Sequence, residues 1–201
     1  NARVKILSEK IARVVGGALV APVVAYVPEG RLSPPTGHMR FPGTVTVPDE
    51  TFQKVLEYAA RSLKLHGFRD IVYLGDHGDT QADQKAVAAR LNREWASTPV
   101  RAHAIDEYYR TAVVDFPRLL SERGYRKEES GLHAGLADTS LMLAVDPLMV
   151  RPGRLRSDSW PAGTTGVSGD PTRASAELGQ LGVEMIVTRT ADAVRKAIAR
   201  R

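Results

Sequence analysis

The stretch Ile71-Val72-Tyr73-Leu74-Gly75-Asp76-His77-Gly78-Asp79 decides the fold. Its apolar residues 71–74 predict a short buried strand, and the alanine-rich residues 81–95 that follow predict a helix. The glycines and acids between them are typical of a loop at the carboxyl end of a strand. Ligands of open α/β sheets bind beyond those strand ends, so His77 and Asp79 lie where a site is expected.

The same alternation of strands and helices extends along the rest of the chain. Buried or alternating strands are predicted at 18–27, 44–47 and 100–105, and helices at 4–14, 48–65, 107–122, after the His133 motif through Met142, from 170 and over 183–200. Strands separated by helices predict an α/β fold with a mostly parallel sheet and helices on both faces. The length of 201 residues predicts a single domain over 1–201.

Composition excludes several classes of function. The chain has no cysteine, so disulfides, thiolate zinc sites and cysteine nucleophiles are excluded, and any metal must be bound by His, Asp or Glu. No apolar run reaches the roughly 18 residues of a membrane helix, and no signal peptide is visible, so we expect a cytoplasmic protein with no membrane partner. The net charge of +5 is diffuse and aromatic residues are 6%, which disfavours nucleic acid as a partner.

His77-Gly78-Asp79 is the first candidate site. An imidazole and a carboxylate two residues apart on a loop suit a divalent cation such as Zn, Mn or Fe(II). The alternative is a polar turn whose acids cap the helix at 81–95.

His133 and Asp138 form the second candidate site, within Gly131-Leu-His-Ala-Gly-Leu-Ala-Asp-Thr-Ser140. A histidine in a glycine-flanked turn is a plausible general acid or base, which a nearby carboxylate can orient. Alternatively, Asp138 belongs to the start of the next helix; the two interpretations of Asp138 are compatible.

Two further residues are candidates for contacting a substrate. His38, close to Phe41-Pro42-Gly43-Thr44, lines a pocket or is an ordinary loop histidine. Trp160 lies on the long Gly/Pro/Ser loop 151–169 and either covers a small-molecule pocket or anchors the loop.

Several motifs in order resemble the creatininase (creatinine amidohydrolase) family over nearly the whole chain. They are His38-Met-Arg-Phe-Pro-Gly-Thr44, His77-Gly78, His133-Ala-Gly135 with Asp138-Thr-Ser140, and Gly166-Val-Ser-Gly-Asp-Pro-Thr172 with Ala176-Glu-Leu-Gly179. A series of motifs in the family's order is far more specific than any one of them.

The resemblance implies a three-layer α/β sandwich with a metal site, often dinuclear, that hydrolyses the C–N bond of a small amide, cyclic amide or formamide. It implies zinc first, with manganese or iron as alternatives, and a homo-oligomer, commonly a hexamer. By position, His77 is a metal ligand and Asp79 stands where creatininase has a ligating glutamate. His133 corresponds to the histidine proposed as proton donor, and Asp138 to the glutamate beside it.

The chain also departs from the family pattern. Aspartate at 138 is one methylene shorter than the usual glutamate, and the family's first metal motif, E-x-H-G-x-H-L-P ending in an aspartate, is absent. The sequence begins at Asn1, about where that motif would end. We therefore expect a fragment of a hydrolase, with Glu29 or His38 as possible substitute ligands. The alternative is a non-catalytic binding or oligomer subunit with a degenerate site.

Overall fold

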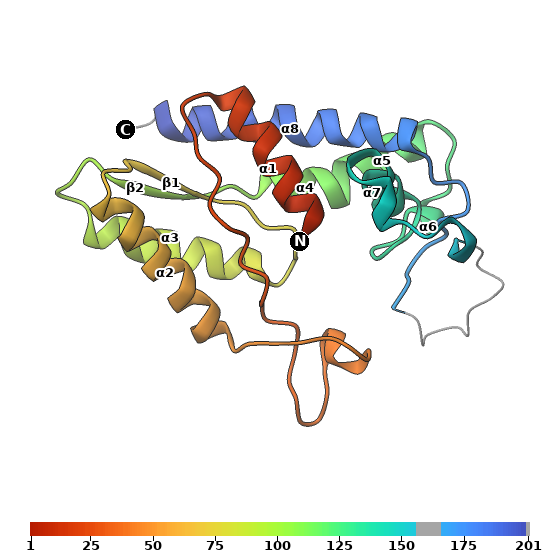
Figure 1. The fold of residues 1–201 in the computed structure, drawn as a ribbon, viewed down its shortest axis with the longest axis horizontal. Helices are drawn as coiled ribbons and strands as arrows, with labels where there is room; N and C mark the ends of the chain where they lie inside the picture. The colour runs from red at the N-terminus through yellow and green to blue at the C-terminus, as the bar shows by residue number, and fades with distance from the viewer. Residues whose placement is uncertain (156–165, 200–201) are drawn as a thin grey trace. The chain divides into compact units, whose positions relative to one another are not determined.

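Two parallel strands, β1 (Asp70–Tyr73) and β2 (Arg101–Ala104), pair with Ile71 opposite Ala102 and Tyr73 opposite Ala104. The computed structural model describes residues 1–155 and 166–199, and in that part of the chain the sheet consists of these two strands. Because parallel strands cannot be joined by a tight turn, a helix has to cross over between them. α3 (Thr80–Glu94) is that helix, and it confirms the α/β class (Figure 1).

The remaining elements are helical. The α-helices are α1 (Ala2–Val15), α2 (Asp49–Leu65), α4 (Glu107–Arg110), α5 (Phe116–Glu122), α6 (Lys127–Ser130), α7 (Leu136–Val145) and α8 (Ala176–Ala199). A π-helix, η2 (Thr111–Asp115), joins α4 to α5, and the short 3-10 helices are η1 (Gly37–Arg40), η3 (Pro147–Met149) and η4 (Pro152–Arg154). None of these helices, as far as the structure describes them, is both long and apolar enough to cross a membrane.

The elements group into two compact units. The first unit comprises Asn1–Ala21 and Glu107–Ala191, and the second comprises Pro22–Asp106 and Asp192–Arg201. The single domain over 1–201 stays a prediction.

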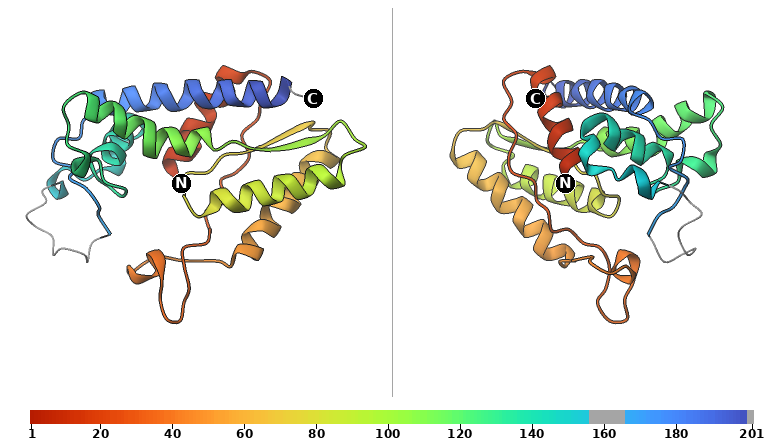
Figure 2. Two further views of the ribbon diagram at one scale, coloured as in Figure 1. Left: turned by 180° about the vertical axis from the view of Figure 1, so that it is seen from behind. Right: turned by 45° about the vertical axis from the view of Figure 1, so that its right-hand side comes forward.

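The core of the second unit lies between its strands and two helices. Side chains alternate along a strand, so Ile71 and Tyr73 of β1 share a face with Ala102 and Ala104 of β2. Phe52, Leu56 and Ala60 of α2 and Val87, Ala88 and Leu91 of α3 form one buried cluster with these strand residues and with Trp95. Both helices therefore cover the same face of the strands, as two views show (Figures 1 and 2).

A buried carboxylate links α2 to α3. Glu57 is 6% exposed, and it accepts hydrogen bonds from Arg61 Nη2 (2.8 Å), Arg90 Nη2 (3.0 Å) and Lys54 Nζ (3.3 Å). The hydrogen bond from Arg61, with that from Lys54, outweighs burial and lowers the pKa of Glu57 from 4.5 to about 2. The carboxylate is thus held in its charged form by three cations, two on its own helix and one on α3.

The elements that the structure describes in the first unit are all helices, and α7 packs against α5, α6 and the first part of α8 (Figure 2). Glycines let α8 approach closely: a Cβ on Gly182 would meet Leu141 Cδ2 at 2.7 Å, and one on Gly179 would collide with the backbone oxygen of Ser140. Leu136, Leu141, Phe116, Leu120 and Ile186 are all fully buried. The apolar start of α7, which carries the second candidate site, is thereby fixed in a tight core.

Two predicted strands are wrong. Residues 18–27 and 44–47 have no ladder partner and are irregular, joined by one backbone hydrogen bond from Val47 N–H to Val27 O (3.4 Å). A strand exists only where a neighbouring segment pairs with its N–H and C=O groups, and residues 18–22 are in addition exposed rather than buried. Val24, Val27 and Val47 do pack against the core cluster.

The largest difference in helix boundaries is at the C-terminal helix. The helix predicted to open at Asp170 begins at Ala176 and runs without interruption to Ala199, so the separate helix over 183–200 is part of α8. Asp170 instead accepts hydrogen bonds from the Thr172 backbone N–H (3.0 Å) and hydroxyl (2.7 Å). These local bonds satisfy the aspartate in a turn that precedes the helix.

The Glu57 network predicts an acid-dependent stability. Because the pKa of Glu57 is lower in the folded chain than its usual 4.5, its stabilisation is present above that value and is lost as the pH falls toward about 2. Glu57→Gln should lower the free energy of unfolding by about 1–3 kcal/mol at pH 7, and by progressively less at lower pH. Urea unfolding followed by circular dichroism at pH 7, 5 and 3 measures this.

Glu94→Gln is the matched control. Glu94 also binds Arg61 (2.7 Å) but is 46% exposed, so solvent screens the pair and its loss should cost less stability than the loss of Glu57. Equal effects of the two substitutions at every pH would contradict the assignment of Glu57 as the link between α2 and α3.

Candidate functional site

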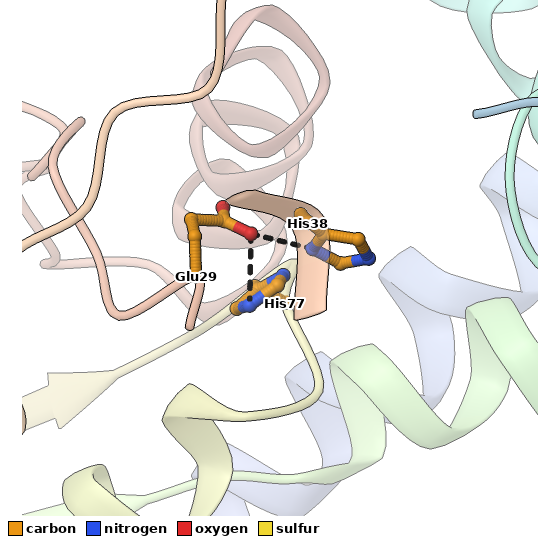
Figure 3. Close-up of side chains that lie close together, drawn as sticks. All are labelled: Glu29, His38 and His77. Atoms are coloured by element: carbon orange, nitrogen blue, oxygen red, sulfur yellow. Dashed lines mark hydrogen bonds and ion pairs between the residues drawn. The ribbon is translucent and has the colours of Figure 1, made fainter. Parts of the chain in front are cut away.

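Glu29, His38 and His77 converge in the second unit (Figure 3). His38 Nδ1 lies 2.5 Å from Glu29 Oε2, and His77 Nε2 lies 3.6 Å from the same oxygen. The two imidazole rings are tilted by 59° with their centroids 5.5 Å apart. One ligand atom from each side chain lies within 4.8 Å of the others, which makes the three residues a candidate metal centre.

Backbone hydrogen bonds hold Glu29 and His38 together. The Glu29 N–H donates to Thr46 Oγ1 (2.9 Å), and the His38 N–H donates to the Glu29 carbonyl oxygen (2.9 Å). Gly37, just before His38, has φ +55°, and a Cβ there would lie 2.6 Å from that same carbonyl oxygen. Only glycine fits this position without strain, so the loop that joins the two ligands depends on it.

The loop after β1 is fixed from the start of α3. The Thr80 hydroxyl donates to the His77 carbonyl oxygen (2.9 Å), and Gln81 Nε2 donates to the carbonyl oxygens of His77 (2.9 Å) and Gly75 (3.2 Å). His77 Nε2 is 3.1 Å from the Pro28 carbonyl oxygen, next to Glu29. A carbonyl oxygen can only accept, so Nε2–H is the donor, and this bond orients the ring toward the 28–38 loop.

The three side chains fit a divalent cation by type and nearly by spacing. Zinc bonds of about 2.0–2.2 Å in a tetrahedron place neighbouring ligand atoms roughly 3.3 Å apart. The Glu29–His77 separation of 3.6 Å is close to this value. Two hydrogen bonds must open on binding, the 2.5 Å Glu29–His38 contact and the bond from His77 Nε2 to the Pro28 carbonyl oxygen, because a protonated nitrogen cannot be a metal ligand. Two nitrogens and one carboxylate oxygen, with a further position for water or substrate, are the ligand set of catalytic zinc sites.

The three side chains are partly exposed. The side chains of Glu29, His38 and His77 are 19%, 34% and 21% exposed. This exposure leaves each of them in contact with solvent, and their partial burial lowers the dielectric screening between them compared with open water.

Asp79, the second predicted metal ligand, lies at the margin of this cluster. Its side chain is 75% exposed, and Oδ2 lies 3.9 Å from His77 Nε2. α3 begins at Thr80 with Asp79 in the N-cap position, but the Asp79 side chain makes no capping hydrogen bond. The structure thus places His38 and Glu29 next to His77, and leaves Asp79 pointing mostly to solvent.

His133 lies in the first unit, in a loop pair built from two motifs that are far apart in the sequence. The His133 and Ser168 backbones exchange two hydrogen bonds (3.3 and 2.8 Å), and the Asp170 N–H donates to the Glu129 carbonyl oxygen (2.9 Å). Gly131, at φ +57°, allows the contact because a Cβ there would collide with the Ser168 carbonyl oxygen. His133 itself is exposed.

The buried side chain of Glu129 anchors this loop pair through hydrogen bonds. Its buried carboxylate accepts from the Arg126 N–H (2.7 Å) and from Arg173 Nη1 (3.1 Å), and the guanidinium of Arg173 stacks 4.2 Å from the centroid of the Tyr125 ring. The backbone hydrogen bond from Arg126, followed by the side-chain bonds of the two arginines, lowers the pKa of Glu129.

Asp138 is the third residue of α7, in its first turn. Oδ1 accepts a hydrogen bond from Arg3 Nη1 (2.7 Å), and Oδ2 accepts one from the Ala134 N–H (3.2 Å). The interpretation of Asp138 as part of the helix start therefore agrees with the structure. Trp160, the last predicted site residue, lies outside the described residues.

A family model described as "Creatininase: Creatinine amidohydrolase" matches residues 4–194. The chain belongs to the creatininase family. The matched region thus includes most of both units, and the order of motifs along the sequence is explained by common descent. A search of curated proteins finds no significant match.

Solved creatininase structures share the fold. A creatinine amidohydrolase (creatininase) is 22% identical with a TM-score of 0.75, over 96% of this chain and 80% of that one. A glutamate-to-glutamine mutant creatininase of "Zn-Zn type" is 23% identical with a TM-score of 0.74, over 96% and 81%. A structure named "Creatininase Mn" is 23% identical with a TM-score of 0.71, over 96% and 81%. The creatininase-like α/β fold predicted from the sequence is confirmed.

For two residues, Glu29 and Arg3, the surrounding sequence does not indicate which side chains they contact. Glu29 follows a valine-rich run and precedes Gly30, a pattern that also fits an ordinary turn, and only the return of the chain through His38 brings it to His77. Arg3 is one of many scattered arginines, and nothing in its neighbourhood indicates a partner 135 residues away.

We expect Glu29, His38 and His77 to bind one divalent cation together. Glu29→Gln and His38→Ala should each weaken Zn²⁺ binding at least about 100-fold, because loss of an indirect partner alone costs 10–100-fold. Isothermal titration calorimetry of the metal-free protein with Zn²⁺ measures the affinity.

The variant Asp79→Asn distinguishes the centre formed by Glu29, His38 and His77 from the metal site predicted at His77 and Asp79. If Asp79 is the ligand that the family resemblance implies, its substitution lowers affinity as much as Glu29→Gln. Should Asp79→Asn be as damaging while Glu29→Gln binds zinc normally, the three-residue centre is wrong.

Proposed function

We propose that the protein is a metal-dependent amidohydrolase that cleaves the C–N bond of a small amide, cyclic amide or formamide. The observation that carries the proposal is the convergence of Glu29, His38 and His77 in a member of the creatininase family. Two imidazoles and a carboxylate near the carboxyl end of a strand supply the ligands that such chemistry needs.

The chain's own residues have distinct roles in this proposal. A divalent cation supplies Lewis acidity and lowers the pKa of a water molecule. Glu29, His38 and His77 bind it and leave a position for substrate and water. His133 donates a proton to the leaving nitrogen, a role assigned because the resemblance matches it to the family's proposed proton donor.

Zinc is the proposed metal, with manganese and iron as alternatives. Imidazole and carboxylate ligands accept all three ions, and the names of two similar structures mention zinc and manganese. A small-molecule amide substrate, a hexameric assembly and a cytoplasmic location are further proposals that follow from the resemblance and from composition. Trp160 remains a proposed substrate contact.

A non-catalytic role is the second candidate. The direct hydrogen bond between His38 and Glu29 favours it, because a site with its ligands bonded to one another is closed to metal until that bond opens. Measuring bound metal and hydrolysis in the same preparation distinguishes the two functions.

His133→Asn tests the catalytic assignment. We expect the purified protein to contain zinc, manganese or iron and to hydrolyse at least one of creatinine, a lactam or an N-formyl amide. The variant should lose at least about 100-fold in kcat, since general acid–base catalysis contributes 10²–10⁴-fold, while its metal content stays unchanged.

His66→Asn is the control, because His66 is exposed at the end of α2. It should hydrolyse the same compound at the wild-type rate. A protein that contains stoichiometric metal but hydrolyses none of these compounds favours the binding role, and a protein without metal contradicts both the metal centre and the hydrolase.

A further inference from the structure

The position of Arg3 is unfavourable for its own helix. Arg3 is the second residue of α1, and the first turn of that helix contains no acidic residue. Cations near a helix N-terminus oppose the helix dipole, so helix stability does not explain an arginine here. Its guanidinium is instead bonded to Asp138 at 2.7 Å, with the Arg3 side chain only 13% exposed.

Asp138 uses its two oxygens for two different purposes. Oδ1 accepts from Arg3, and Oδ2 accepts from the backbone N–H of Ala134 (3.2 Å). With one hydrogen bond on each oxygen, the carboxylate is held in a single orientation between Arg3 and the Ala134 N–H. As an aspartate it is also shorter than the family's usual glutamate, a reach that suffices for the Ala134 N–H four residues back.

The backbone conformation of Ala134 has to be stabilised by its surroundings. With φ 51°, it is the only non-glycine residue in the left-handed region among residues 1–155 and 166–199. Such a conformation costs an alanine of the order of 1 kcal/mol and persists only where the surroundings enforce it. The first turn of α7 does so on both sides of Ala134, because Asp138 binds its N–H and the Thr139 hydroxyl donates to its carbonyl oxygen (3.0 Å).

The left-handed turn sets the direction of His133. His133 immediately precedes Ala134, and its other backbone constraint is the pair of hydrogen bonds with Ser168. The imidazole therefore leaves the backbone between two fixed points, the Ser168 bridge and the Ala134 turn. If the turn relaxes, the histidine keeps only one of them.

We propose that Arg3 and Asp138 form a positioning pair, in which Arg3 aligns the Asp138 carboxylate so that it holds the Ala134 turn and thereby fixes His133. The inference rests on the proposed function, in which His133 protonates the leaving nitrogen. It assigns Asp138 to positioning rather than to proton transfer, and it gives the first helix a part in the site.

A double-mutant cycle with amide exchange tests the pair without reference to activity. Arg3→Met removes the charge but keeps the aliphatic stem, and Asp138→Asn keeps the shape but removes the charge. Each should speed hydrogen exchange of the Ala134 amide, measured by ¹H–¹⁵N NMR, about tenfold. The double variant should exchange no faster than Asp138→Asn alone, because Arg3 acts through Asp138.

Arg13→Met is the matched control, on the same helix but exposed in its last turn. It should leave Ala134 exchange unchanged, and Arg3→Lys should restore most of the protection. Unchanged Ala134 exchange in Arg3→Met, or additive effects in the double variant, would overturn the proposal.

Kinetics separate positioning from simple stability. With whichever of creatinine, the lactam or the N-formyl amide the wild type hydrolyses, Arg3→Met should lower kcat about tenfold with KM within about twofold, and Arg3→Lys should recover it. Bound metal, measured by elemental analysis, should be unchanged in every variant. A wild type with no metal and no hydrolysis contradicts the proposed function, whereas the exchange result decides the positioning pair in either case.

Discussion

The parallel pairing of β1 and β2 is the constraint on which the second unit depends. Parallel strands need a crossover, and α3 provides it directly after a loop of six residues, 74–79. That loop must then lie at the carboxyl end of β1, where the start of α3 binds it through Thr80 and Gln81. His77 is consequently fixed by the same geometry that builds the core, rather than by interactions of its own ring alone.

In the loop of His38 and in the loop of His133, a glycine allows two backbone segments to approach each other closely. Gly37 allows the chain to approach the Glu29 carbonyl, and Gly131 allows the loop of His133 to approach Ser168. In each case a neighbouring functional side chain is held by main-chain hydrogen bonds, which are short and directional.

The carboxylates discussed above fall into two groups according to their hydrogen-bond partners. Glu57 and Glu129 are buried and bonded to arginines, which holds their pKa values low and leaves them with structural roles. Asp138 is bonded to one arginine and one backbone N–H and belongs with them in our proposal. Glu29 differs because it is partly exposed and faces two histidines, side chains that can bind a cation together with it.

The sequence by itself determined the class of fold, the strands at 71–74 and 100–105 within about one residue, most helices, and the identity of His77 as a residue at a strand end. These follow from local periodicity, which a helix or strand expresses over a few neighbouring residues. The motif order also determined the family. The valine-rich run 18–27 was misassigned as a strand because strand formation depends on a partner that periodicity does not report.

Only the tertiary structure decided which side chains meet. Glu29 and His38 lie 48 and 39 residues before His77 in the sequence. They reach it because the 28–48 segment folds back on itself, with Val47 bonded to Val27 and Thr46 bonded to Glu29, and no hydrophobic periodicity predicts this path. Arg3 and Asp138 meet because α1 packs on α7. Contacts of this kind depend on how elements dock, and docking is set by the sum of many weak apolar contacts that no single stretch of sequence encodes.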